Sequence, residues 1–284
     1  KFVMNKKNKL VDEFSYDPVT AISESNAPKE IAIIFKDIKK TMGIPIVTSI
    51  WRGLADMDDS LLNVWNLTKP IFNNGEPEFI YNKLFEHISL PSPPKITSDT
   101  LERMGINNKE LKNIKNIVSV YNRSNTMNLI ALSALVNVNF SYISSSKNYK
   151  TSSINYQLPA LLERHEINNN TWKIVKNINA YGTTNGFRAH VATLWRHLSY
   201  WPKFLDFVDL QFRPMRDNGQ IEQALETVLN YVLINKIILK EDTKSHHQLN
   251  KLTVSTITNY VHSKHQVVRM VTLGNILQKW LFKK

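Results

Sequence analysis

The chain has no cysteine among its 284 residues, which excludes disulfide bonds, thiolate metal sites and cysteine nucleophiles. Glycine is scarce, with 8 residues, and no Gly-rich phosphate loop, dinucleotide-binding fingerprint or serine nucleophile elbow occurs. The most apolar stretch, 127–143, is interrupted by Asn137 and Asn139 and is too short to span a bilayer. We therefore expect no membrane association and no cofactor. Because no secretory-signal pattern opens the sequence, we expect a cytoplasmic protein.

The net charge is +12, from 36 Lys and Arg against 24 Asp and Glu. This surplus favours anionic partners, which range from small carboxylates to nucleic acid. The basic residues are scattered, and no helix-turn-helix pattern accompanies them, so a solvated surface is the simpler interpretation. A basic face with aromatic neighbours around Arg188, Arg196 and Lys203 remains the alternative, in which the protein associates with nucleic acid.

One segment of the chain occurs twice. The stretch from Val47 to Ile71 recurs in the second half, from Val191 to Met215, with 7 identities in 25 pairs. Upstream, 34–38 resembles 174–178 at a slightly shorter spacing. A duplication of this length predicts two homologous halves, not a short-period solenoid. A pocket is then expected where the halves meet.

Apolar residues recur mainly at helical spacing, so we predict an all-α fold. It would be a pseudo-dimer of two helical repeats, at 28–140 and 165–284, joined by a connection at 141–164. Pro202 suits the first turn of a helix. Expected helices cover 30–42, the Trp51 segment, 60–72, a short helix capped by Asp99 that ends at Gly105, 108–121, 126–138, 171–180, 191–200, 203–212, 221–239, 252–262 and 266–282.

The Trp-Arg pairs of the two repeats are the best-defined polar feature. Each Arg, Arg52 or Arg196, either bonds carbonyl groups at a neighbouring helix end or clamps a substrate carboxylate through its two nitrogens. Metal binding is not expected, because the pairs His246-His247 and His262/His265 have no carboxylate at helical spacing.

The segment from Ile34 to Ile71, with Gly43-Ile44-Pro45-Ile46-Val47 and then Arg52-Gly53-Leu54-Ala55, resembles the first repeat of the group I (DL-type) 2-haloacid dehalogenases. The resemblance continues through 121–125 (Tyr-Asn-Arg-Ser-Asn), 157–159 (Gln-Leu-Pro) and 200–202 (Tyr-Trp-Pro). More distantly, the arrangement is similar to the alkylhydroperoxidase D-like helical superfamily. The resemblance implies two fused helical repeats with a central pocket for a small organic acid.

The family's reaction, as the resemblance implies it, uses an Asp in the second repeat to activate a water molecule. That Asp aligns with Leu194, and the Ser before it aligns with Thr193. Two pocket aromatics fall on Ile46 and Ser49, with Ile50 beside them. The Asn that helps to hold the water is kept as Asn125.

A leucine cannot accept a proton, and a general base typically supplies a factor of about 10²–10⁴ in rate. His190 lies four residues before Leu194 on the same helix face and is a candidate substitute, although a histidine packed at a helix start is the simpler interpretation. We therefore expect a 2-haloacid dehalogenase-like hydrolase whose activity depends on a substitute base. The alternatives are a protein of the same fold with another reaction, and a non-catalytic protein that binds a small ligand. We expect a monomer or a homodimer, because the two repeats of one chain are enough to form the pocket.

Overall fold

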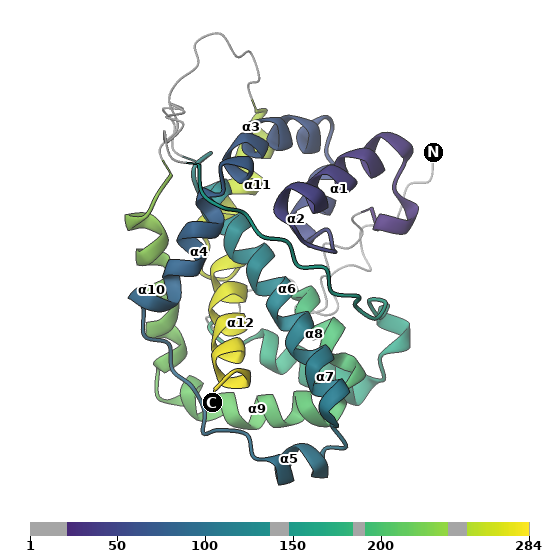
Figure 1. Ribbon diagram of the computed structural model, residues 1–284, viewed down its shortest axis with the longest axis vertical. Helices are drawn as coiled ribbons and strands as arrows, with labels where there is room; N and C mark the ends of the chain where they lie inside the picture. Colours follow the sequence, from purple (N-terminus) through teal and green to yellow (C-terminus); the bar gives the residue numbers. More distant parts are fainter. Residues whose placement is uncertain (1–21, 137–147, 184–190, 238–248, 284) are drawn as a thin grey trace, which may run out of the picture.

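The computed structural model describes residues 22–136, 148–183, 191–237 and 249–283 (Figure 1). These residues form α-helices, short 3₁₀ turns and irregular segments, and none of them lies in a strand. The predicted all-α class is confirmed. No helix in this part of the chain combines the length and apolar character needed to cross a membrane.

The described residues of the first half form six α-helices. They are α1 (Lys29–Met42), α2 (Ser49–Ala55), α3 (Ser60–Asn74), α4 (Glu76–His87), α5 (Ser98–Arg103) and α6 (Asn108–Ser133). Helix α4 was not predicted from the sequence. The cap of α5 was expected at Asp99, whereas the side chain of Thr97 accepts the capping hydrogen bond.

The predicted pair of helices at 108–121 and 126–138 was wrong, because α6 is one continuous helix. It begins at a capping box, in which Asn107 and Glu110 each accept a hydrogen bond from the other's backbone N–H. The polar residues from Asn122 to Asn125 look like a break in the sequence. They are buried instead, and partners from distant parts of the chain pair with Asn122 and Arg123.

Six more α-helices occur in the part of the second half that the structure describes. They are α7 (Asn169–Asn179), α8 (Thr193–His197), α9 (Pro202–Asp217), α10 (Gln220–Ile234), α11 (Lys251–His262) and α12 (Val267–Leu281). A 3₁₀ turn, Leu198–Tyr200, follows α8, so the predicted helix over 191–200 is shorter than expected. Pro202 occupies the first turn of α9, as predicted.

Several helices of the two halves start in the register of the sequence repeat. Helix α7 begins after the start of α1 at the same spacing along the chain that separates 174–178 from 34–38. Helix α8 follows α2, and α10 follows α4, at the same spacing along the chain that separates 191–215 from 47–71. The equivalent tryptophans Trp51 and Trp195 are both buried. The interpretation as a pseudo-dimer, with repeats at 28–140 and 165–284, stays a prediction.

Helices α6 and α12 pack side by side in the middle of the molecule (Figure 1). The side-chain amide of Asn122 donates a 2.7 Å hydrogen bond to the backbone carbonyl of Gly274. A Cβ atom at position 274 would collide with Oδ1 of Asn122, so only glycine permits this close approach.

Residues 148–163, which we call the strap, run as an extended segment without helix across α6 (Figure 1). In the first half, the backbone N–H of Tyr149 donates to the carbonyl of Asn74 at 2.8 Å, and that of Ile154 donates to the carbonyl of Gly43 at 2.8 Å. Gly43 has a positive φ of 61°, and a side chain there would collide with the carbonyl oxygen of Ser152. The strap is therefore held closely against the first half.

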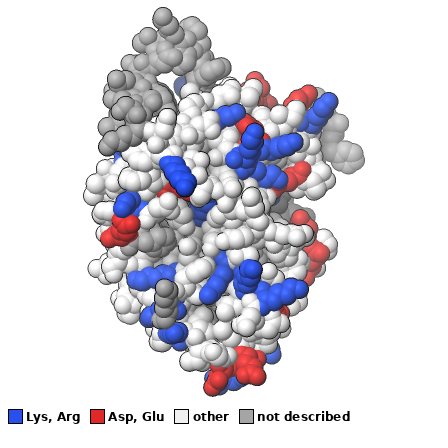
Figure 2. Space-filling model, viewed as in Figure 1, with Lys and Arg blue, Asp and Glu red and all other residues white. Residues whose placement is uncertain are grey.

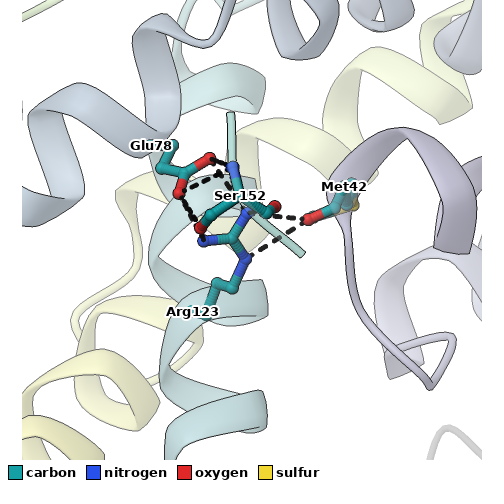
Figure 3. A network of polar contacts seen from close by, with 4 residues as sticks. All are labelled: Met42, Glu78, Arg123 and Ser152. Atoms are coloured by element: carbon teal, nitrogen blue, oxygen red, sulfur yellow. Dashed lines mark hydrogen bonds and ion pairs between the residues drawn. The ribbon is translucent and has the colours of Figure 1, made fainter. Parts of the chain in front are cut away.

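Figure 3 shows the buried polar network that holds the strap. Arg123 donates to both carboxylate oxygens of Glu78, at 2.7 and 3.0 Å, and to the carbonyl of Met42, at 3.1 and 3.3 Å. The backbone N–H and the hydroxyl of Ser152 donate to Glu78. Burial raises the pKa of Glu78, but the bonds from Arg123 and Ser152 outweigh burial and hold this pKa below its ordinary value of 4.5.

Figure 2 shows one face of the molecule, on which Lys and Arg lie in several separate groups with apolar and neutral surface between them.

Gly274→Ala is expected to lower the free energy of unfolding by about 1–3 kcal/mol, because the added methyl group overpacks the contact between α6 and α12. Gly53→Ala in α2 is the matched control, since nothing lies within 4 Å of a Cβ atom placed there. It should leave stability unchanged or raise it. Urea unfolding of both variants tests this, and equal losses would contradict the close contact of the two helices at this point.

Glu78→Gln is expected to cost about 3 kcal/mol of stability at pH 7, because it leaves Arg123 buried without its carboxylate. The folded-state pKa of Glu78 is lowered, so its contribution is present above pH 4.5 and is lost as the pH falls through the folded-state value. The difference between wild type and variant should therefore narrow below pH 4.5. Urea unfolding at several pH values measures this difference in unfolding free energy. A difference that stays constant with pH would contradict the stabilising role of the Glu78 carboxylate.

Candidate functional site

A cavity of about 420 Å³ lies where the strap meets both halves of the chain. This volume falls within the range typical of small-molecule pockets. Its apolar wall comes mainly from the segment before α2 and from the strap: Pro45, Ile46, Val47, Leu158 and Pro159. Its polar and charged residues come from all three parts: Glu24, Arg52, Tyr121, Glu163, Thr193 and His197.

Arg52 places an unsatisfied donor in this wall. Its side chain, 5% exposed, projects from α2, and its Nε atom is buried without a hydrogen-bond partner among the described residues. Burial lowers the pKa of Arg52, and the charges of Glu24 and Glu163 partly offset this effect. A guanidinium stays protonated at neutral pH, so a positive charge lies in the wall of the cavity.

Arg196, the counterpart of Arg52 in the second repeat, is placed differently. It is 1% exposed, and its Nε and one terminal nitrogen donate to the carbonyl of Leu162 in the strap, at 3.2 and 2.8 Å. The carboxylate of Glu163 lies 3.6 Å away. Burial lowers the pKa of Arg196 to about 10. Arg196 therefore fastens the strap to the second half.

Tyr121 from α6 and His197 from α8 are in contact with each other in the wall of the cavity. The Tyr121 hydroxyl lies 3.2 Å from Nδ1 of His197, and Nε2 of His197 lies 2.8 Å from the carbonyl oxygen of Pro159. Burial is the main cause of both pKa shifts: it raises the pKa of Tyr121 and lowers that of His197. Both groups are therefore neutral at pH 7.

The two carboxylates beside the cavity are already engaged or open to solvent. Glu24 pairs with Lys39 at 2.6 Å and accepts a 3.0 Å hydrogen bond from the backbone N–H of Val47. The side chain of Glu163 is 58% exposed. Neither carboxylate is poised as a buried base. The described residues contain no group of three or more His, Asp or Glu that could hold a metal ion.

The cavity includes three of the residues that were proposed for the site from the sequence, namely Ile46, Arg52 and Thr193. The other proposed residues within the described part of the chain are buried but are not among those that line it: Ser49, Ile50, Asn125, Leu194 and Arg196. The proposed substitute base, His190, lies outside the described residues.

Tyr121, His197 and the strap residues were not predicted from the sequence as parts of the wall. Tyr121 stands at the start of the quoted 121–125 segment, and His197 directly follows Trp195-Arg196. Nothing local indicates their pairing, because Tyr121 lies on α6 and His197 on α8, far apart along the chain.

No family model matches the chain, and a comparison with curated protein sequences finds no match. Among solved structures, the chain is similar to a D-2-haloacid dehalogenase mutant in complex with D-2-CPA, with a TM-score of 0.72 and 15% identity over 92% of this chain and 95% of that one. It is also similar to a D-2-haloacid dehalogenase with L-LA, with a TM-score of 0.72 and 14% identity over 92% and 96%. The chain therefore has a D-2-haloacid dehalogenase-like fold.

The resemblance proposed from the sequence needs correction. The structures that match are D-2-haloacid dehalogenases, so the assignment to the group I (DL-type) family and, through it, to the alkylhydroperoxidase D-like superfamily was wrong. It depended on short segments such as 43–47 and 121–125. Segments of that length are too local to define a family when overall identity is 15%.

The buried imidazole predicts a pH dependence of stability. The pKa of His197 in the folded state lies below its ordinary value of 6.5, so below pH 6.5 the unfolded chain binds a proton that the folded chain does not. Stability should therefore fall as the pH drops from 6.5 through the folded-state pKa. His197→Gln, which keeps a donor toward Pro159, should reduce this slope in thermal unfolding between pH 7.5 and pH 5.5. If stability depends on pH as steeply in His197→Gln as in the wild type, His197 is not the source of this pH dependence.

Proposed function

We propose that this protein binds a small organic carboxylate in the cavity, with the guanidinium of Arg52 as the anion-binding group. One observation carries the proposal: Arg52 is buried in the cavity wall, and its Nε has no hydrogen-bond partner among the described residues. A buried guanidinium with an unsatisfied donor is costly, and an anion in the cavity would lower that cost. A carboxylate matches the planar fork of the guanidinium and can accept two hydrogen bonds.

The comparison between the two repeats supports this assignment. Arg196, at the equivalent position, has the strap carbonyl of Leu162 as its acceptor, so its burial is compensated within the chain. The Nε of Arg52 has no such acceptor among the described residues. The side chain of Arg52 is therefore available to a ligand, whereas that of Arg196 is not.

Binding is better supported than hydrolysis, because the candidate bases among the described lining residues are hydrogen-bonded, ion-paired or largely open to solvent. Both ring nitrogens of His197 have partners, and Glu24 is paired with Lys39. In the alignment made from the sequence alone, Leu194 stands at the position of the catalytic Asp.

Arg52→Met is expected to weaken ligand binding without loss of stability, whereas Arg196→Met is expected to lower the stability of the fold. Arg52→Met should weaken binding of 4-methylpentanoate, measured by calorimetry at pH 7.5, about ten-fold or more, since bonds to charged groups contribute about 1.5–3 kcal/mol. Its stability should be kept or raised, because an uncompensated charge is removed. Arg196→Met should lose about 2 kcal/mol of stability, because it breaks the bonds to Leu162.

Equal binding by wild type and Arg52→Met would contradict the proposed function. So would a complete absence of binding by the wild type, or a loss of stability in Arg52→Met as large as in Arg196→Met.

The second candidate is hydrolysis of 2-haloacids, which the likeness to D-2-haloacid dehalogenases supports at the level of fold. With Leu194 in place of the base, chloride release from 2-chloropropionate should not exceed the uncatalysed rate. Leu194→Asp should raise it if the rest of the pocket is retained. Release by the wild type that His190→Ala abolishes would instead establish His190 as the base and favour this candidate over simple binding.

A further inference from the structure

The hydrogen bonds around His197 fix the direction of every proton in the chain of contacts from Pro159 to Tyr121. A carbonyl oxygen can only accept, so Nε2 of His197 carries the hydrogen that points to Pro159. In the neutral imidazole, Nδ1 is then an acceptor. The Tyr121 hydroxyl, 3.2 Å from Nδ1, must therefore donate its one hydrogen to His197.

Tyr121 is left with lone pairs and no proton for a ligand. Arg52, in the same cavity wall, can only donate. The cavity thus offers two kinds of polar group to one small molecule: donors with positive charge at Arg52, and a neutral acceptor at Tyr121. A ligand that satisfies both carries an anionic group and, near it, a hydrogen-bond donor.

We infer that the ligand of this cavity is a hydroxy carboxylic acid, whose carboxylate binds Arg52 and whose hydroxyl donates to the Tyr121 oxygen. The inference rests on the proposed function, because it extends the carboxylate site of Arg52. This preference for a hydroxyl group distinguishes the protein from one that is selective for a haloacid, since a halogen has no hydrogen to donate to Tyr121. Sites built to bond a hydroxyl group discriminate against analogues that lack it.

An amino acid would also combine a carboxylate with donors, but the charges around the cavity disfavour it. Its ammonium group would lie in the same cavity as the cation of Arg52. The carboxylate of Glu24 is held by Lys39, and that of Glu163 is largely exposed and faces Arg196. A neutral hydroxyl group meets none of this repulsion.

The apolar part of the wall indicates a substituent larger than a methyl group. Ile46, Val47 and Leu158 line the cavity, which at about 420 Å³ leaves room for a branched aliphatic chain. Burial of such a chain against these residues adds to affinity.

The test compares three acids with one carbon skeleton: 4-methylpentanoate, its 2-chloro derivative and its 2-hydroxy derivative, with each enantiomer of the last two measured separately. Calorimetry at pH 7.5 should show the better hydroxy enantiomer binding about five-fold more tightly than either other acid, as expected for one added hydrogen bond. Tyr121→Phe, which removes the acceptor, should bring this ratio to about one.

The outcomes separate the two claims. If all three acids bind wild type equally and Arg52→Met weakens each of them, the hydroxy-acid inference is overturned and the carboxylate site stands. If none of the acids binds, the proposed function fails and the inference fails with it. Tighter binding of the 2-amino derivative than of the hydroxy acid would also overturn the inference. The wild-type ratio decides the question even if Tyr121→Phe does not fold.

Discussion

The strap, residues 148–163, is the constraint on which the arrangement of the cavity depends. It carries no helix, so its backbone groups are free to bond to both halves of the chain. Its first part donates to carbonyls of the first half and is fixed by the buried pair of Glu78 and Arg123 (Figure 3). Its last part accepts hydrogen bonds from Arg196 and His197 of the second half. The same last part, from Leu158 to Glu163, also forms one wall of the cavity. The contacts that hold the strap to the second half therefore also position this wall.

The duplicated sequence acquires two roles because the strap is not duplicated. Arg52 and Arg196 stand at equivalent positions and are both buried, which costs free energy unless each finds an acceptor. The strap carbonyl of Leu162 supplies that acceptor for Arg196. Arg52 lines the cavity, and its Nε has no such acceptor among the described residues. The strap thus gives Arg196 a structural role that Arg52 does not share.

Helical periodicity was sufficient to predict the all-α fold, and the repeated Trp-Arg segment led directly to Arg52. Long-range pairing could not be predicted in this way. The polar residues near Asn122 resemble a loop until their partners, such as Gly274, are seen across the fold. For the same reason α6 was divided in two. Tyr121 and His197 each look unremarkable along the chain, because what makes them a pair is a contact between α6 and α8. The family resemblance, which was carried by short segments, gave the wrong group even though it led to the right fold class.

The proposed function depends on a buried arginine whose acceptor comes from outside the chain. A crystal structure of the protein with 2-hydroxy-4-methylpentanoate at a saturating concentration would test this most directly. We predict a carboxylate oxygen within hydrogen-bond distance of the Arg52 guanidinium and the hydroxyl group facing the Tyr121 oxygen. An empty cavity at saturation, or a carboxylate bound elsewhere while Arg52 pairs with a group of its own chain, would contradict this role of Arg52.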